Sequence, residues 1–451
     1  MKKFRGVILS MVIGLALSAC SGAGGGKEAA PTPTGGGTTE STTTADSAKT
    51  TNSTEKDTIK IGVAGCITGA NAESGRQTVE GAKLAAEYIN ENGGIEAFGG
   101  KKVELVLIDN TSDPNQSALA LERALDANPD IVGVVGNPTS SALLPMLPIL
   151  QKYKVPAISS TAANAGITEQ GCEFIFQPTV IGSQQSEVMI AFLKDLAVKM
   201  GKDPAELQIG IVYENSSWGQ DVAKGHKTLC EENGLKVGIE ETYPSSGLSD
   251  AGPIITKLKN AKVDVLLAAT YVPDTKLLVS TMNTMNYKPV IIGSGGGLGW
   301  PTLFNDMGED TTGICCINAW LWDSSFVQAN KTFYDDIRVR YEETHGNEFM
   351  GEQVGPAFIN TMMIKDAIEN GKSLDPVTVR DEVLKMTGEN NEWFALIHPE
   401  SEFNEAGRNV GSIGNLPLMG QWQEGRLRTV FPGEYAEKAV IDPLTLKPLG
   451  N

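Results

Sequence analysis

IKIGVAG at residues 59–65 is a short apolar run that ends in a glycine, as buried strands often do before a turn. A polar turn follows, and then a helical pattern places four apolar residues on one face: Val79, Ala82, Ala86 and Ile89. Gly93 and Gly94 close this helix, and KKVELVLID at residues 101–109 is the next apolar run. A strand, a helix and a strand in this order predict a βαβ unit with both strands parallel in one sheet.

The alternation of strands and helices continues through residue 294. Further strands are expected at residues 130–136, 155–159, 207–214, 236–243, 263–270 and 289–294. Helices are expected between them, near residues 143–153, 187–200, 221–233, 253–261 and 274–285. Strands so rich in Val, Ile and Leu indicate parallel sheets with helices on both faces. The 393 residues from 59 to 451 are more than usually pack around one hydrophobic core. The predicted fold class is therefore α/β with two doubly wound lobes.

The chain after residue 294 is less regular. Helical patterns are found at residues 327–343, 357–370 and 376–386. LPLMGQW at 416–422 and RLRTVF at 426–431 predict a hairpin. These elements could form a third domain, but their short length better suits additions to the two lobes.

The composition excludes several classes of protein. The 451 residues carry 37 Lys and Arg against 55 Asp and Glu, a net charge of -18, whereas a nucleic-acid binder needs a basic surplus. The 6 cysteines are too few for a disulfide scaffold of this length, and the 3 histidines lie too far apart for a short metal motif. We therefore expect no cofactor and no metal.

The first twenty residues are typical of an export signal. Three basic residues precede an apolar stretch that is too short to span a bilayer. Leu17 to Cys20 resembles the bacterial lipobox, which implies that the Cys20 thiol carries lipid and anchors the protein to the membrane. Residues 21–58 contain no large apolar residue and are expected to form a disordered tether rich in Thr and Gly.

Motifs for covalent chemistry are weak. GSGGGLG at 293–299 lacks both the Lys-Ser/Thr of a phosphate loop and the G-x-G-x-x-G spacing, so it is interpreted as a flexible turn. Cys66 has no nearby base in the sequence and is interpreted as a small side chain packed in the core. Cys315 and Cys316 are expected to be buried thiols, and whether Cys66 pairs with Cys172 stays open.

Ligands bind beyond the carboxyl ends of the strands in open α/β sheets. Five segments lie at such ends: residues 65–76, 137–141, 159–164, 215–219 and 271–274. Thr139, Ser140 and Ser141 follow a strand and precede a helix, so hydroxyls and free N–H groups are expected to meet there. This corner suits a carboxylate or another anion.

Six stretches resemble the leucine/isoleucine/valine-binding group of solute-binding proteins that serve ABC importers. They are IKIGVAGCITGANAESG (59–75), YINENGGI (88–95), LIDNTSDPNQS (107–117), VVGNPTSSALLPMLPILQKYKVPAISS (134–160), IGIVYENSSWGQ (209–220) and FNEAGR (403–408). The resemblance implies a type I periplasmic binding fold: two Rossmann-like lobes, joined by three crossings, that close over a small ligand by a hinge. It also implies a binding protein that is not an enzyme and an ABC permease as its partner.

Lobe boundaries follow from the same resemblance. The first lobe would comprise residues 59–178 and 321–405, and the second lobe residues 179–320 and 406–451. The irregular end of the chain would then return to both lobes.

Several site residues are implied by the resemblance. Ser140 and Ser141 would hold the ligand carboxylate, and Thr161 and Ala163 would line the next loop. Trp218 would cover the ligand, and Tyr271 would be a second pocket aromatic.

Two positions depart from the family pattern. Amino-acid binders of this family usually place a carboxylate for the ligand ammonium where this chain has Gly295, and Ser74 stands where many members have an aromatic residue. Either another acid takes the role, with Asp274, Asp323 and Glu352 as candidates, or the ligand is not a standard α-amino acid.

The expected function is therefore capture of a small amino acid-like ligand by a lipoprotein on the extracytoplasmic face of the cell membrane. An anchored ligand sensor that presents its closed form to a signalling receptor is the alternative. A hydrolase that uses Cys66 or Ser140 is the least favoured hypothesis.

Overall fold

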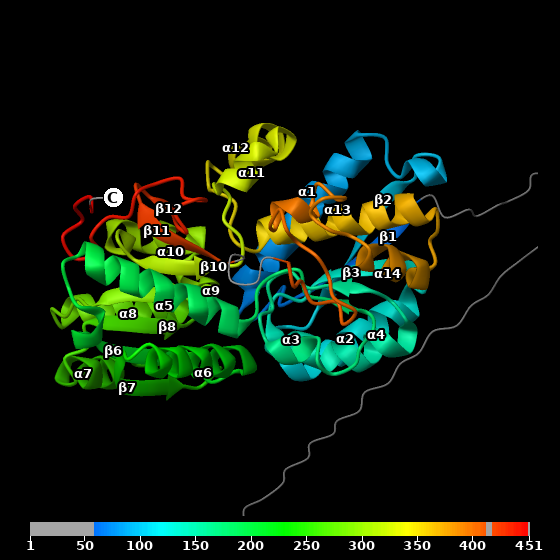
Figure 1. The fold of residues 1–451 in the computed structure, drawn as a ribbon. Coiled ribbons are helices and arrows are strands. Elements are labelled where there is room, and N and C mark those ends of the chain that lie inside the picture. Colours follow the sequence, from blue (N-terminus) through cyan, green and yellow to red (C-terminus); the bar gives the residue numbers. More distant parts are fainter. Residues whose placement is uncertain (1–57, 412–416, 450–451) are drawn as a thin grey trace, which may run out of the picture. The chain divides into compact units, whose positions relative to one another are not determined.

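The first predicted strand lies in the middle of a parallel sheet. In the computed structural model, β1 (Thr58–Gly65) pairs with β2 (Lys102–Asp109) on one side and β3 (Ile131–Gly136) on the other. The structure describes residues 58–411 and 417–449, all of which belong to one compact unit. Figure 1 shows these residues as a ribbon.

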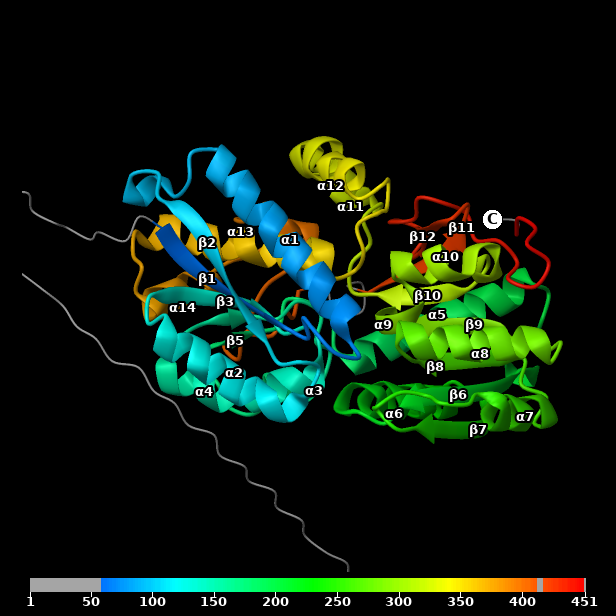
Figure 2. The ribbon, with the colours of Figure 1, turned by 180° about the vertical axis from the view of Figure 1, so that it is seen from behind.

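The first sheet has the strand order β2-β1-β3-β4-β5, and all of its pairs are parallel. Its two remaining strands are short: β4 (Ala157–Ile158) and β5 (Ile175–Phe176). One face is covered by α1 (Ala72–Glu91) and α13 (Val354–Gly371), and the other by α2 (Pro114–Ala127), α3 (Ser140–Leu143) and α4 (Leu147–Tyr153) (Figures 1 and 2). The sheet and these helices form the first lobe.

Helices α1 and α13 come from distant parts of the sequence and pack closely against each other. A side chain at Gly81 of α1 would overlap the Val354 carbonyl of α13. The glycine therefore permits the close approach of the two backbones. Helix α14 (Pro376–Leu384) packs beside α13 and against β3.

The second sheet has the strand order β12-β11-β10-β9-β8-β6-β7. Its seven strands are β6 (Gln208–Glu214), β7 (Lys236–Tyr243), β8 (Val265–Ala269), β9 (Val290–Ser294), β10 (Cys315–Asn318), β11 (Leu418–Gln423) and β12 (Arg426–Phe431). β11 runs antiparallel to both of its neighbours, which confirms the predicted hairpin. The other pairs are parallel.

Helices cover both faces of the second sheet as well (Figure 2). Helices α5 (Gly182–Lys199) and α6 (Ser217–Glu232) pack on one face. The other face carries α7 (Gly252–Asn260), α8 (Val272–Thr284), α9 (Gly295–Leu298) and α10 (Pro301–Met307). The sheet and these helices form the second lobe, so the predicted α/β class with two parallel-rich lobes is confirmed.

The chain passes between the lobes after β5, after β10 and again before β11. The second passage is firmly held, because the Trp320 indole N–H donates to the Leu396 carbonyl (3.0 Å) and both Trp320 and Trp322 are buried. Beside it, buried Asp323 accepts hydrogen bonds from the hydroxyl and the N–H of Thr429 in β12. The residues at which the lobes divide remain a prediction.

The helix predicted at residues 327–343 is interrupted, so that expectation is wrong in part. The structure has α11 (Ser325–Ala329), a π-helical segment (Thr332–Ile337) and α12 (Arg338–Thr344). The break has a local cause: the Asn330 side chain accepts the Phe333 N–H (3.0 Å) and begins a new helical segment there.

Two further expectations need correction. The helix expected at 143–153 starts at Ser140 and has a 3₁₀ turn at Leu144–Met146, where a proline lacks the N–H that an α-helix needs. GSGGGLG is not a flexible turn, because Gly295–Leu298 forms one helical turn. A side chain at Gly297 would lie 2.6 Å from the Tyr271 Cα, so the glycine allows this turn to pack against the start of α8.

All five cysteines of the described residues are free and buried. Cys66 is not paired with Cys172, and its thiol lies 3.5 Å from the Thr139 hydroxyl. Cys315 and Cys316 belong to different core clusters, as expected for neighbours that point to opposite faces of a strand.

Residues 58–411 and 417–449 contain no helix long and apolar enough to cross a membrane and no cluster of ligands suited to a metal ion. The predicted signal peptide, the lipidation site Cys20 and the tether lie outside the described residues. The one exception is Thr58, the last residue assigned to the tether, which begins β1.

Candidate functional site

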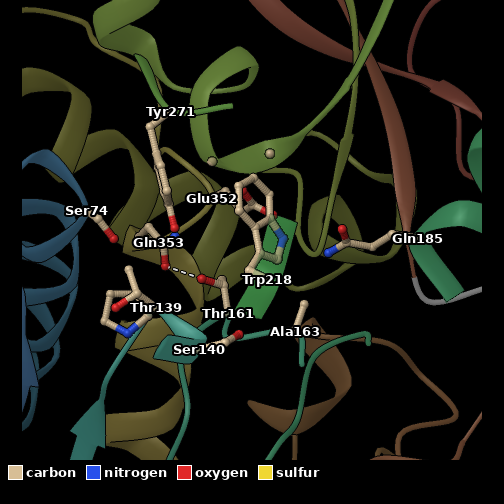
Figure 3. A pocket seen from close by; sticks show the side chains of 13 residues that line it. Ser74, Thr139, Ser140, Thr161, Ala163, Gln185, Trp218, Tyr271, Glu352 and Gln353 are labelled. Carbon is tan, nitrogen blue, oxygen red and sulfur yellow. Dashed lines mark hydrogen bonds between the residues drawn. The ribbon is translucent and has the colours of Figure 1, made fainter. Parts of the chain in front are cut away.

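A polar pocket lies where the carboxyl ends of strands from both sheets meet. Its volume is about 390 Å³, including its open mouth. Its thirteen lining residues are Ser74, Pro138, Thr139, Ser140, Thr161, Ala163, Gln185, Trp218, Tyr271, Gly295, Gly296, Glu352 and Gln353. Figure 3 shows ten of them with labels.

Six of the seven residues predicted to bind ligand line this pocket: Ser140, Thr161, Ala163, Trp218, Tyr271 and Gly295. They come from five separate segments of the chain. Ser141 is the seventh, and it is not part of the lining. Successive residues of a helix point in directions about 100° apart, so α3 directs only Ser140 into the pocket.

The corner after β3 presents hydroxyl groups, as expected. The Asn137 side chain accepts the Thr139 N–H (3.2 Å), and Thr139 and Ser140 are both buried. Ser140 Oγ accepts the Asn164 N–H (3.1 Å), which leaves its own proton available to an acceptor in the pocket.

A second polar pair stands beside this corner. The Thr161 hydroxyl donates to the side-chain carbonyl of Gln353, the residue that precedes α13 (Figure 3). This bond orients the Gln353 side chain and leaves its NH₂ group as a donor in the pocket. Thr161 and Gln353 therefore offer further partners for an anionic or carbonyl group.

Aromatic rings form the wall contributed by the second lobe. Trp218 lies in the first turn of α6, where the Ser216 side chain accepts the N–H groups of Trp218 (3.2 Å) and Gly219 (3.3 Å) as an N-cap. The Trp218 and Tyr271 rings have centroids 5.2 Å apart and a 45° interplanar angle. Trp218 also packs on Ala163 of the first lobe.

A hydrogen bond joins the two lobes beside the pocket residues Ala163 and Trp218. The Asn164 side-chain NH₂ donates to the Ser217 carbonyl (3.1 Å), while its oxygen accepts the Gly166 N–H (2.9 Å). The first lobe thus contacts the first residue of α6, the helix that carries Trp218.

Two buried oxygen atoms of the lining have no hydrogen-bond partner within the described residues: Ser74 Oγ and Gln185 Oε1. Buried polar atoms are almost always paired, so both atoms are suited to a ligand or a water molecule. Ser74 was noted in the sequence as a departure from the family pattern. Gln185 was missed, because it lies inside α5, away from any strand end.

Glu352 fills the space that a side chain at Gly295 would need. A Cβ on Gly295 would collide with the Glu352 carboxylate. Glu352 Oε1 accepts the Ala319 N–H (2.7 Å), and burial raises the pKa of the carboxyl group to about 7. Glu352 was one of three acids considered from the sequence, and it alone of the three lines the pocket.

The other two acids are engaged elsewhere. Asp274 accepts the Leu248 N–H (2.7 Å), and Asp323 accepts from Thr429 at the crossing between the lobes. Burial raises the pKa of both carboxyl groups.

Comparison with known proteins agrees with this geometry. A family model described as periplasmic binding protein matches residues 58–411. A Leu/Ile/Val-binding protein homolog 7 from Brucella melitensis is 26% identical over 384 residues, which is 83% of this chain and 91% of the relative. A Leu/Ile/Val-binding protein homolog 8 from Brucella abortus is 24% identical over 400 residues, which is 86% and 93% of the two chains.

Solved structures share the fold. A branched-chain amino acid transporter substrate binding protein from Streptococcus pneumoniae, in complex with isoleucine, has a TM-score of 0.69 at 22% identity and covers 82% of this chain and 97% of its own. A solute binding protein of an ABC transporter from Rhodopseudomonas palustris, in complex with 3,4-dihydroxy benzoic acid, has a TM-score of 0.68 at 20% identity, with 86% and 99% covered.

Proposed function

The chain belongs to the periplasmic binding protein family, and on that premise we propose that it is the solute-binding lipoprotein of an ABC importer. It captures a small amino acid-like ligand, such as a branched-chain amino acid or a related amide or carboxylate. It delivers this ligand to the transmembrane subunits of a permease. It binds its ligand without transforming it.

The observation that carries this proposal is the pocket itself, which has walls from both lobes. Hydroxyl and amide donors stand on one wall and two aromatic rings on the other. Pockets for small polar molecules combine a few placed polar groups with apolar cover in this way.

The ligand class is supported by the relatives. Two Brucella relatives are named as Leu/Ile/Val-binding homologs, and one neighbour in fold was solved with isoleucine. Another neighbour was solved with an aromatic acid, which has a carboxylate and no ammonium. A carboxylate is common to both of these ligands, and Ser140 with its neighbours is suited to accept one.

Closure of the hinge follows from the position of the pocket. A ligand that contacts both walls favours the closed form by the free energy of the contacts it adds there. The bond from Asn164 to the Ser217 carbonyl is a direct contact between the lobes that opening of the hinge would stretch.

Lipid on Cys20 would hold the protein at the extracytoplasmic face of the cell membrane, with residues 21–58 as a tether. Replacing Cys20 by Ala should release the protein from the membrane fraction and remove the lipid mass from its amino-terminal peptide. Retention in the membrane without Cys20 would contradict lipid anchoring.

A ligand panel tests the binding function. The full chain, purified in detergent, is titrated with the standard amino acids, their amides and small amine-free acids, with calorimetry and tryptophan fluorescence as readouts. We expect saturable binding of at least one compound with a Kd near 1 µM, about -8 kcal/mol. Absence of saturable binding across the panel would contradict the proposed ligand class.

A further inference from the structure

Glu352 is a buried carboxylate without a cationic partner. It is 6% exposed and stands in the turn that precedes α13. Among residues 58–411 and 417–449, no Lys, Arg or His contributes to the shift of its pKa, which burial, the Ala319 N–H and the Trp300 indole determine. A charge that is enclosed in this way is unfavourable until a cation joins it.

The two oxygen atoms of Glu352 have different surroundings. Oε1 accepts the Ala319 N–H (2.7 Å) and is thereby fixed in position. Oε2 is the atom closest to the place where a Gly295 side chain would begin. The carboxylate thus reaches from the first lobe to the first turn of α9 in the second lobe, and the absence of a side chain at Gly295 makes room for it.

The pocket contains both donors and acceptors of hydrogen bonds. The Ser140 hydroxyl and the Gln353 NH₂ group can donate hydrogen bonds, whereas Glu352 and the unpaired Gln185 oxygen accept them. Figure 3 shows the Ser140 hydroxyl below the Trp218 rings and the Glu352 carboxylate beside them. A pocket with both kinds of group suits a ligand with an anionic and a cationic end.

We propose that Glu352 supplies the counter-charge for a ligand ammonium group, so that the ligand is a small zwitterion of the α-amino acid type. Its carboxylate contacts the Ser140 corner, and its ammonium contacts Glu352 Oε2. This inference rests on the proposed binding function and deepens it, because it names a charge that the ligand must carry.

The test uses an isosteric variant. Glu352→Gln keeps an oxygen for the Ala319 N–H and removes the charge. The probes are the twenty standard amino acids and, for each one that binds, the matching carboxylic acid without the amino group. Asp274→Asn is the matched control, since it neutralises a buried carboxylate outside the pocket lining.

We expect Glu352→Gln to weaken amino acid binding by about 30-fold or more, as for truncation of one partner of a buried charge pair. Asp274→Asn should change it by less than about threefold. Gly295→Ala should also weaken binding by at least about tenfold, because its Cβ would displace the Glu352 carboxylate without changing any charge. The melting temperature of each variant shows whether it is folded.

Unchanged amino acid affinity in a folded Glu352→Gln variant would overturn the inference and leave the binding function intact. Binding of amine-free acids or amides only, with no amino acid bound, would also overturn it while the binding function stands. If no compound of the panel binds, both the proposed ligand class and the inference that rests on it are contradicted.

Discussion

The two walls of the pocket differ in chemistry. The first lobe contributes Ser140, Thr161, Glu352 and other hydrogen-bonding side chains, whereas the second lobe contributes mainly the rings of Trp218 and Tyr271 and two glycines. This difference indicates that the two lobes have different roles in ligand binding. Under the proposed function, the first lobe would recognise the polar groups of a ligand, and the second lobe would cover the ligand and exclude water.

Replacing Trp218 by Ala should weaken binding as strongly as Glu352→Gln does, and for every ligand. Truncation of a central buried aromatic typically costs 2 kcal/mol or more, so we expect every ligand of the panel that binds to lose about 30-fold or more in affinity. Calorimetry measures the loss, and Trp218→Phe should restore most of it because a ring is retained. A loss confined to one ligand would contradict the assignment of this wall as a general cover.

The acid stability of the second lobe should depend on His226 of α6. This side chain is fully buried, both ring nitrogens lack a partner among residues 58–411 and 417–449, and burial lowers its pKa to about 3. Below about pH 6.5 the His226 side chain binds a proton in the unfolded chain but not in the folded protein. The free energy of unfolding therefore decreases as the pH is lowered, until the folded pKa of about 3 is reached. From pH 7 to pH 5 the wild type should lose about 2 kcal/mol more unfolding free energy than His226→Leu.

Urea unfolding at the two pH values measures this difference. Glu352 and Glu214, whose carboxyl pKa values burial raises to about 7, act in the opposite direction and are the same in both proteins. An equal pH dependence of wild type and variant would show that His226 is not enclosed as described.

Ser140→Ala should reduce affinity about tenfold, near 1.4 kcal/mol, for ligands that have a carboxylate. The variant removes a donor to the ligand and the acceptor of the Asn164 N–H. Ser141→Ala is the matched control, because it deletes the same group one residue further along, outside the pocket lining. An equal loss of affinity in both variants would contradict a specific role of Ser140 in ligand recognition. It would instead support the predicted role of Ser141.

Asn164→Asp should have the smallest effect. Aspartate keeps an oxygen for the Gly166 N–H and removes the NH₂ group that binds the Ser217 carbonyl. Loss of one hydrogen bond between the lobes should destabilise the closed form relative to the open form. Binding of every ligand should therefore weaken about fivefold, near 1 kcal/mol. Titration calorimetry of the variant detects this change, and a selective loss for one ligand would point to direct contact instead.

The fold could be predicted to a large extent from the sequence. Each strand expected before residue 295 contains an observed strand, because buried parallel strands form continuous runs of Val, Ile and Leu. The errors lie where local side chains act on the backbone. Asn330 divides one helix, and close packing of Gly297 on Tyr271 turns an expected loop into a helical turn.

The pocket lining was predictable where it follows strand ends. Ser140 and Trp218 each stand at the start of a helix after a strand, which the sequence displays. Gln185 and Glu352 reach the pocket only through the packing of α5 and α13. From the sequence, Glu352 is therefore only one of three candidate acids, and the contact with Gly295 is needed to choose it.

Proton release on binding tests the central claim most directly. Burial raises the pKa of the Glu352 carboxyl group to about 7, so the group is partly protonated at pH 7. A ligand ammonium favours the ionised carboxylate and expels that proton. Raised pKa values keep Cys316 and Tyr271 neutral at pH 7. Burial also raises the pKa of Glu214, near Tyr271, to about 7, but Glu214 is the same in wild type and variant.

Calorimetry of amino acid binding at pH 7, in buffers with different ionisation enthalpies, counts the protons released. We predict that the wild type releases more protons per ligand bound than Glu352→Gln, because the variant has no Glu352 proton to release. Equal proton release by both proteins, or none by the wild type, would contradict Glu352 as the counter-charge of the ligand.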